Sequence, residues 1–182
     1  KDGKAPGLWS NGGAFVLPSF GSRLHMKRSV VRDCEASSGG AVELKNGAVL
    51  VMEESTIKSN KAKFGGGLYA WLGAKVKIVN GTTSYLLNNT APDGGGLFLT
   101  DTGTHLIVTG SGTRLVVEGN TAKKGGGGIK VHNSAYVVLS SGARVEVKKN
   151  IATVNCGGFY LDAKAKLEIK GKSTHLLIDS NN

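Results

Sequence analysis

The sequence predicts an all-β fold, a right-handed parallel β-helix (a solenoid) of about six coils with three short strands in each coil. Three observations predict it. A glycine-rich phrase recurs through the chain, segments of alternating apolar residues follow every copy, and no helical segment lies between them. Self-similarity at an interval of roughly 20–50 residues is the signature of a repeat architecture.

The recurring phrase joins an asparagine to a run of glycines. It reads NKAKFGGGLYA from Asn60, NTAPDGGGLFL from Asn89 and NTAKKGGGGIKV from Asn120, with altered copies from Asn150 and Asp33. The copies align on the last glycine before each strand, or on the alanine in its place. These residues are Ala14, Ala41, Gly67, Gly96, Gly128 and Gly158, at intervals of 27, 26, 29, 32 and 30.

Three strands are expected in each unit. The first follows the glycines and alternates apolar and variable residues, as in LYA, LFL and IKV. The second begins at Arg23, Val49, Lys75, His105, Tyr136 and Lys166, and the third ends in the asparagine phrase. Period-two alternation indicates half-buried strands. One unit cannot bury its own apolar face, so units must stack with parallel strands, and parallel connections are right-handed in most proteins.

The alternative is a β-sandwich built from hairpins. Hairpins need turn signals every 8–12 residues or so, whereas here each position matches its counterpart from unit to unit. The β-helix is therefore favoured.

The recurring asparagine is predicted to point into the coil. Stacked amides at one corner of successive coils can donate hydrogen bonds to each other and accept them. We expect a structural ladder, in which Val30 precedes the first member as an apolar residue precedes each of the others. The predicted members are Asp33, Asn60, Asn89, Asn120, Asn150 and Asn181.

The glycines are predicted to form a sharp corner, because a residue without a Cβ permits a tight bend or a positive φ. Alanines two residues after the asparagine, at positions 62, 91, 122 and 152, keep that corner small. The predicted corner glycines are Gly40, Gly66, Gly67, Gly95, Gly96, Gly127, Gly128 and Gly158.

Composition limits the classes of function. The chain has 182 residues and a formal net charge of +10, but its 23 Lys and Arg residues are spread through all units, so no specific nucleic-acid interface is expected. No apolar run approaches the ~20 residues of a transmembrane helix. We interpret residues 1–182 as a single β-helix repeat domain, a segment of a longer chain. Cys34 and Cys156, four coils apart, are too distant for a disulfide.

The repeat phrases resemble those of a known family. IKSNKAKFGGGLY, VEGNTAKKGGGGIK and SSGGAVEL are similar to the twin FxxN and GGA[I/L/V] repeats of the chlamydial polymorphic outer membrane proteins, over about residues 30–182. The resemblance implies a β-helical surface protein that acts in adhesion. This chain departs from the pattern because no first motif position is Phe and the third-position Ala is usually Gly.

Two outward columns contain candidate ligand or partner residues. The first strands present Tyr69, Phe98 and Tyr160, with Trp71 close by, and exposed stacked aromatics bind sugar rings or protein surfaces. The second strands present Lys75, Lys77 and His105, a group that could bind an acidic sugar. No carboxylate is expected beside the second group, so we predict no catalytic residue, no metal site and no cofactor.

Asn80 and Asn88 begin Asn-x-Thr sequons and are candidate glycosylation sites at exposed corners. The sequence therefore predicts a non-catalytic structural or adhesive segment of an extracellular or cell-surface protein. Its expected partners are further coils or subunits stacked end to end, into a fibre in one version, and host or matrix glycans or acidic polysaccharide. The alternative is a carbohydrate-active β-helix, a lyase or epimerase, or a binder that acts on acidic polysaccharide.

Overall fold

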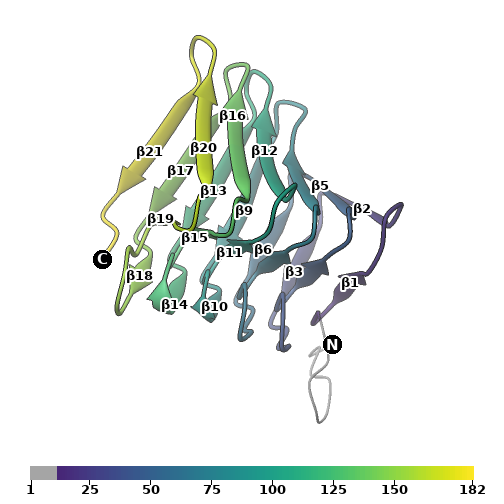
Figure 1. Ribbon diagram of the computed structural model, residues 1–182. Coiled ribbons are helices and arrows are strands. Elements are labelled where there is room, and N and C mark those ends of the chain that lie inside the picture. Colours follow the sequence, from purple (N-terminus) through teal and green to yellow (C-terminus); the bar gives the residue numbers. More distant parts are fainter. Residues whose placement is uncertain (1–11) are drawn as a thin grey trace.

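Parallel strands stack as six successive coils along one axis in the computed structural model, which describes residues 12–182 (Figure 1). Residues 1–11 of the predicted repeat domain lie outside this part of the chain. Each strand pairs with the equivalent strand of the next coil, and all assigned pairs between the described strands are parallel. The predicted β-helical fold is confirmed.

Three six-stranded sheets and one short sheet run along the stack. The first sheet contains β1 (Phe15–Leu17), β4 (Val42–Leu44), β7 (Leu68–Ala70), β11 (Leu97–Leu99), β15 (Ile129–Val131) and β19 (Phe159–Leu161). The second contains β2 (Arg23–Lys27), β5 (Val49–Glu53), β8 (Lys75–Ile78), β12 (His105–Thr109), β16 (Tyr136–Ser140) and β20 (Lys166–Lys170). The third contains β3 (Val30–Arg32), β6 (Thr56–Lys58), β9 (Thr83–Leu87), β13 (Arg114–Glu118), β17 (Arg144–Lys148) and β21 (His175–Asp179).

A fourth, three-stranded sheet adds to the three strands per coil that the sequence predicts. It consists of β10 (Thr90–Asp93), β14 (Thr121–Gly125) and β18 (Ile151–Ala152). Isolated parallel bridges such as Lys61↔Thr90 extend it into the earlier coils. The segment between the asparagine and the glycines is therefore part of the stack, because its backbone also pairs with the neighbouring coils.

The inward columns of the first three sheets form one continuous core. Leu68 pairs with Leu97, and Val76 pairs with Leu106, in the predicted register. Leu44, Leu50 and Ile57 represent the three sheets in one coil, and each is fully buried. The described residues contain no helix long and apolar enough to cross a membrane.

The asparagine ladder forms as predicted from Asn60 to Asn181. The Oδ1 of Asn89 accepts hydrogen bonds from both the backbone N–H and the Nδ2 of Asn60, each at 3.0 Å. The Nδ2 of Asn89 donates to Asn120 Oδ1 at 3.0 Å and to the Ile57 carbonyl at 3.1 Å. Asn120 and Asn150 repeat this arrangement. Every polar group of these buried amides therefore has a partner, as buried polar groups require.

The first member of the ladder was predicted wrongly. Val31, and not Val30, pairs with Ile57, and the side chain of Val30 is 59% exposed. Cys34 therefore occupies the ladder position, where its backbone N–H donates to Asn60 Oδ1 at 3.0 Å. Asp33 lies outside the ladder and adopts φ +57°, like Asn88 at +52°. Asp33 was chosen because Asp resembles Asn. The observed register is shifted by one residue, and such a shift reverses which side chains face inward.

The corner glycines lie at a bend of the chain, as predicted, but they do not themselves adopt a positive φ. The positive φ belongs to the glycine that precedes them, as in Gly65 at +58° and Gly94 at +61°. The predicted residues are required to be glycine by lack of space. A Cβ on Gly66 would lie 2.4 Å from the Gly95 carbonyl oxygen, and one on Gly95 would lie 2.4 Å from that of Gly127. At Gly66 and Gly95 adjacent coils approach too closely for a side chain.

Candidate functional site

Four aromatic rings gather on the outside of the first sheet. Tyr69 lies in β7 and Phe98 in β11, and their Cα atoms are paired across the two strands. Trp71 follows β7 directly, and Phe64 precedes the glycines of the same coil. We call Phe64, Tyr69, Trp71 and Phe98 the aromatic surface. Parallel strands hold its centre rigidly, because both Tyr69 and Phe98 sit within the hydrogen-bonded ladder.

The rings of the aromatic surface are in mutual contact. The centroid of the Tyr69 ring is 5.3 Å from that of Phe98, 5.9 Å from that of Phe64 and 6.1 Å from that of Trp71. These spacings lie within the range of favourable ring pairs. Phe98 was predicted to be exposed and is only 6% exposed, because its neighbours cover it, whereas Phe64 is 42% exposed. The surface available to a partner is therefore formed by Phe64, Tyr69 and Trp71.

Phe64 was not predicted as part of this surface. It comes from the corner before the glycines, where Ser38 and Asp93 occupy the equivalent positions of the neighbouring coils. The positive φ of Gly65 turns the chain back at this point and brings the corner beside the first sheet. The phrase FGGGLY contains both Phe64 and Tyr69, and this closeness in the sequence was the available signal.

A buried carboxylate borders the aromatic surface. Glu43 precedes Tyr69 in the same outward column and is 2% exposed. Its Oε1 accepts a hydrogen bond of 3.2 Å from Trp71 Nε1, and its Oε2 has no hydrogen-bond partner. Burial raises the pKa of Glu43 above its ordinary value, although Trp71 and Lys45 oppose the shift. Burial, with smaller contributions from Asp101 and Glu43, raises the pKa of Tyr69 to about 12.

A lysine ends the aromatic surface on the other side. Lys130 follows Phe98 in the column, and its Nζ lies 5.1 Å from the Phe98 ring centroid and 5.6 Å from that of Tyr160. The same Nζ forms an ion pair of 2.7 Å with Asp93, which is itself buried. The predicted residue Tyr160 is therefore separated from the other rings by a paired cation.

Lys75, Lys77 and His105 lie on the second sheet, away from the outward column of the aromatics. His105 pairs with Lys75 across the two strands, as predicted. Its Nδ1–H donates to the Gly103 carbonyl at 2.6 Å. The His105 ring is nearly perpendicular to the Tyr136 ring, and the two ring centroids are 5.6 Å apart. The predicted binding residues thus form two separate groups on two sheets.

The second sheet also brings a carboxylate towards His105, which the sequence did not predict. A shallow hollow of about 430 Å³ is lined by His105, Tyr136, Lys166 and Glu168, among others. The pKa of Tyr136 is raised mainly by the hydrogen bond between its hydroxyl group and Glu168. Lys170 pairs with Glu168, and their hydrogen bond is the largest of the effects that lower the pKa of this carboxyl. Residues of β12 and β20 line one hollow because strands two coils apart are only about 10 Å apart along the stack.

The two sequon asparagines are both exposed and differ in their contacts. Asn80 Nδ2 donates to Glu53 Oε1 at 2.6 Å, and Glu53 also accepts from His25 Nε2 at 2.9 Å. Asn88 precedes the ladder residue Asn89 at φ +52°. A glycan is attached at Nδ2, so attachment at Asn80 must compete with its contact to Glu53.

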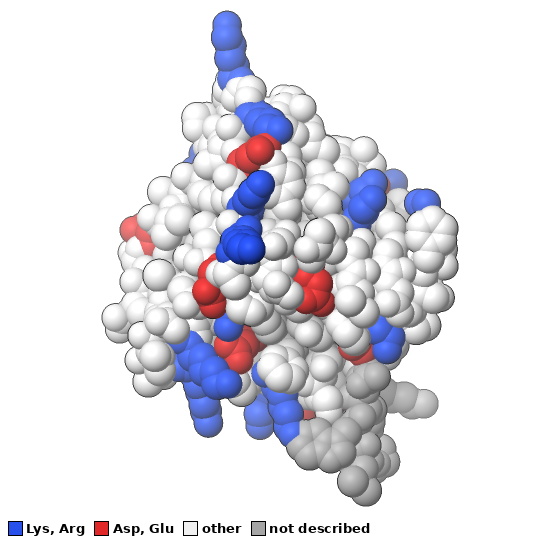
Figure 2. Space-filling model, viewed as in Figure 1, with Lys and Arg blue, Asp and Glu red and all other residues white. Residues whose placement is uncertain are grey.

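The charged groups on the outside of the coils are largely interspersed. Figure 2 shows Lys and Arg at several separate places on the face in view, with Asp and Glu among them. Glu146 is buried on the third sheet and forms ion pairs with Arg114 at 2.6 Å and Arg144 at 2.7 Å. Among residues 12–182, no group of three or more His, Cys, Asp and Glu side chains is placed to hold a metal ion. Both cysteines are free, Cys34 buried and Cys156 exposed.

Comparison with known families places this architecture. A sequence model described as the right-handed beta helix region matches residues 8–181, nearly the whole chain. The chain belongs to the right-handed β-helix family. This membership agrees with the predicted fold and its hand, and it is broader than the resemblance to polymorphic outer membrane proteins. No curated protein and no solved structure matches this chain in the other two comparisons.

Proposed function

We propose that this β-helix is a non-catalytic adhesive module of an extracellular or cell-surface protein, and that its aromatic surface binds the sugar rings of a glycan. The contact among Phe64, Tyr69 and Trp71, on strands and corners fixed by their neighbours, is the observation that carries the proposal. Aromatic faces with a polar edge suit sugars, which present apolar C–H faces and hydroxyl groups. Trp71 Nε1, Glu43 and Lys130 border the rings as polar groups.

Rigidity supports binding over catalysis. The aromatic side chains lose little conformational entropy when a ligand docks, because ring contacts already restrict them. The carboxylates that border the surface are engaged: Glu43 with Trp71 and Asp93 with Lys130.

The proposal is tested by titrating the β-helix with defined oligosaccharides, with chitohexaose and cellohexaose as neutral probes and a heparin-derived hexasaccharide as an acidic one. We expect at least one to bind, and Trp71→Ala and Tyr69→Ala to weaken it by about tenfold or more, since central aromatic anchors dominate binding energies. Tyr85→Ala, on the third sheet, is the matched control and leaves binding unchanged. Equal loss in all three variants would contradict the proposal.

A carbohydrate-active enzyme is the second candidate, and the hollow beside His105 is the observation that favours it. His105, Tyr136 and Lys166 could bind an acidic sugar there. The hydrogen bond to Glu168 raises the pKa of Tyr136, so this phenol stays protonated and does not act as a general base. Incubation with alginate and pectate decides the matter. Unsaturated products that disappear in His105→Ala would overturn the non-catalytic proposal.

We also propose that the stack is extended end to end by further coils or subunits. The last coil exposes apolar side chains of all three main sheets, with Leu161 at 41%, Ile169 at 48% and Ile178 at 52%. Unpaired strand edges with apolar side chains are templates for additional strands. Sedimentation at rising protein concentration should show association that Ile169→Lys reduces. A chain that remains monomeric with an ordered last coil would contradict this part of the proposal.

A further inference from the structure

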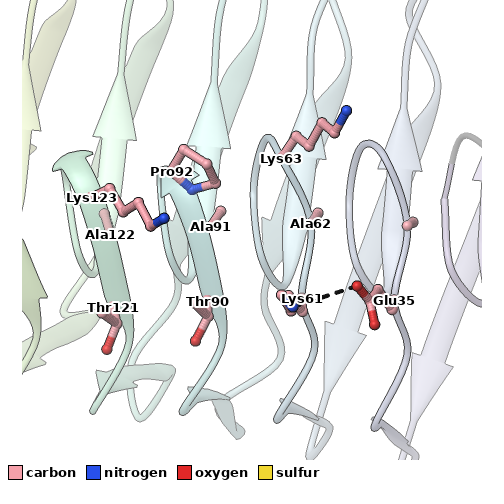
Figure 3. A pocket seen from close by; sticks show the side chains of 11 residues that line it. Glu35, Lys61, Ala62, Lys63, Thr90, Ala91, Pro92, Thr121, Ala122 and Lys123 are labelled. Atoms are coloured by element: carbon pink, nitrogen blue, oxygen red, sulfur yellow. Dashed lines mark ion pairs between the residues drawn. The ribbon is translucent and has the colours of Figure 1, made fainter. Parts of the chain in front are cut away.

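A groove of about 350 Å³ runs along the outside of the fourth sheet and the bridges that extend it (Figure 3). Its lining comes from four successive coils, at the corner between the asparagine ladder and the glycines. Ala62, Ala91 and Ala122 form its floor, and Figure 3 shows them in line along the stack. The alanines that keep this corner small on the inside thus leave a channel on the outside.

The floor of the groove offers apolar groups and few hydrogen-bonding groups. The three alanines are buried to 7% exposure or less, so they close the groove from below, and the apolar surface open to a ligand comes mainly from the side chains around them. The backbone beside them is occupied by the parallel ladder: Thr90 N–H donates to the Asn60 carbonyl at 2.9 Å, and Ala62 N–H donates to the Thr90 carbonyl at 3.1 Å. The ring of Pro92 adds further apolar lining. A sugar, which needs many polar partners, is therefore a poor occupant.

The walls of the groove are basic. Lys61, Lys63 and Lys123 line it, and all three are exposed, whereas Glu35 is the only acidic residue of the lining. Glu35 lies at one end and pairs with Lys61 at 3.5 Å. Lys123 lies on the coil at the other end (Figure 3). An anionic group is therefore favoured at the Lys123 end and disfavoured at the Glu35 end.

We propose that this groove binds a single-chain anionic amphiphile, a free fatty carboxylate. The alkyl chain lies along the alanine floor, parallel to the axis of the coils, and the carboxylate lies beside Lys123. The groove crosses three coil steps, roughly 14 Å at the spacing of parallel strands, which sets the length of alkyl chain it can cover. This inference is independent of the proposed glycan site, because no residue of the aromatic surface lines the groove.

Titration with carboxylates of increasing chain length tests the proposal. Octanoate, decanoate, dodecanoate and tetradecanoate are added to the full chain at pH 8, below their micellar concentrations, with heat as the readout. Affinity should rise about two- to fourfold per methylene, because each buried methylene contributes up to about that factor. It should stop rising once the chain is longer than the groove. Affinity that does not change with chain length would overturn the proposal.

Charge and competing ligands provide the second arm. Dodecyltrimethylammonium, with the same chain and the opposite charge, should bind at least about tenfold more weakly than dodecanoate. Binding to vesicles of anionic phospholipid without binding of monomeric dodecanoate would overturn the proposal in favour of a membrane surface. Binding of oligogalacturonate at this groove in place of dodecanoate would overturn it in favour of a polysaccharide.

Variants locate the site. Lys123→Glu should weaken dodecanoate binding about tenfold, and Thr90→Trp should reduce it by filling the groove. Lys172→Glu makes the same charge change in the exposed turn between β20 and β21 and should have no effect. Circular dichroism confirms that each variant is folded, and Lys123→Glu keeps the test decisive if the Thr90 variant does not fold. Equal affinities for Lys123→Glu and Lys172→Glu would overturn the proposal.

Discussion

Asn89 and Phe98 belong to the same coil, and each contacts the equivalent residue of both neighbouring coils. Asn89 has asparagine on both sides, whereas Phe98 lies between Tyr69 and Lys130. From Asn60 to Asn181 the inner position holds one residue type, because every donor and acceptor must be matched away from water. The outer position allows many types, because solvent and flexible side chains accommodate them. Positions whose residue type repeats from coil to coil therefore mark the core of this protein. Positions whose residue type changes mark the surface on which function can vary.

The largest expected effect is that of breaking the ladder. Asn89→Ala removes two donated and two accepted hydrogen bonds from a fully buried site, and leaves the Asn60 backbone N–H without its acceptor. We expect a loss of about 3 kcal/mol in the free energy of unfolding, from the cost of buried unpaired polar groups. Urea denaturation measures it. Asn88→Gly removes the neighbouring exposed side chain, suits the positive φ, and should change stability little; an equal loss would refute the ladder's importance.

A methyl group at the glycine corner should have the next largest effect. A Cβ on Gly95 would lie 2.4 Å from the Gly127 carbonyl oxygen, so Gly95→Ala must push two coils apart. We expect a loss of about 2 kcal/mol, the range of overpacking. Gly73→Ala is the matched comparison, since it has space and only an unfavourable φ of +80°, at a cost of about 1 kcal/mol. The opposite order of denaturation midpoints would mean that φ, and not contact between coils, selects these glycines.

Extending the ladder should have a smaller effect, of opposite sign. Cys34→Asn places an amide where its Nδ2 can donate to Asn60 Oδ1, which accepts only the Cys34 backbone N–H there. We expect a gain of about 1 kcal/mol, the net value of one hydrogen bond. Asp33→Asn, at the position predicted from the sequence, should leave stability unchanged. Thermal unfolding of the two variants compares the sequence-based and observed registers directly.

The smallest expected effect is a difference in pH dependence between two buried glutamates. Because the pKa of Glu43 is raised in the folded state, this group contributes stability that is fully present below its ordinary pKa. That stability is lost as pH rises through the folded-state pKa. The lowered pKa of Glu146, caused mainly by Arg114, means stability that is present above the ordinary pKa and lost as pH falls. Glu43→Gln and Glu146→Gln should remove these opposite trends in stability between pH 3 and 7. Parallel profiles would contradict the assignment.

The sequence predicted the inward columns well, because burial repeats the same residue types in every coil. Leu68, Leu97 and Ile129 occupy one column as expected, and the second strands begin at the predicted residues. The error at Asp33 arose in the first coil, where Cys34 replaces asparagine. Only one of the coils next to it carries an asparagine, Asn60. The repeat pattern therefore did not show which of Asp33 and Cys34 occupies the ladder position.

The candidate surfaces were predicted only in part, because they depend on contacts between residues of different segments. The register placed Tyr69 and Lys130 on either side of Phe98, but the alternation of the strands did not show that Phe64, from the corner, would also cover Phe98. The carboxylate of Glu168 near His105 was missed for the same reason. The groove outside Ala91 depends on the path of the backbone at the corner, and the periodicity of the sequence does not predict that path.

The ladder also gives the molecule a direction. From Asn60 to Asn150, each amide nitrogen donates to the oxygen of the next coil, so the amide dipoles point the same way along the axis. The two ends of the ladder are consequently unlike, because an amide oxygen faces one end and an amide nitrogen faces the other. A contact that continues this order joins unlike ends, and such heterologous contacts generate open filaments and not closed two-fold dimers. End-to-end assembly that continued the ladder would therefore be head-to-tail.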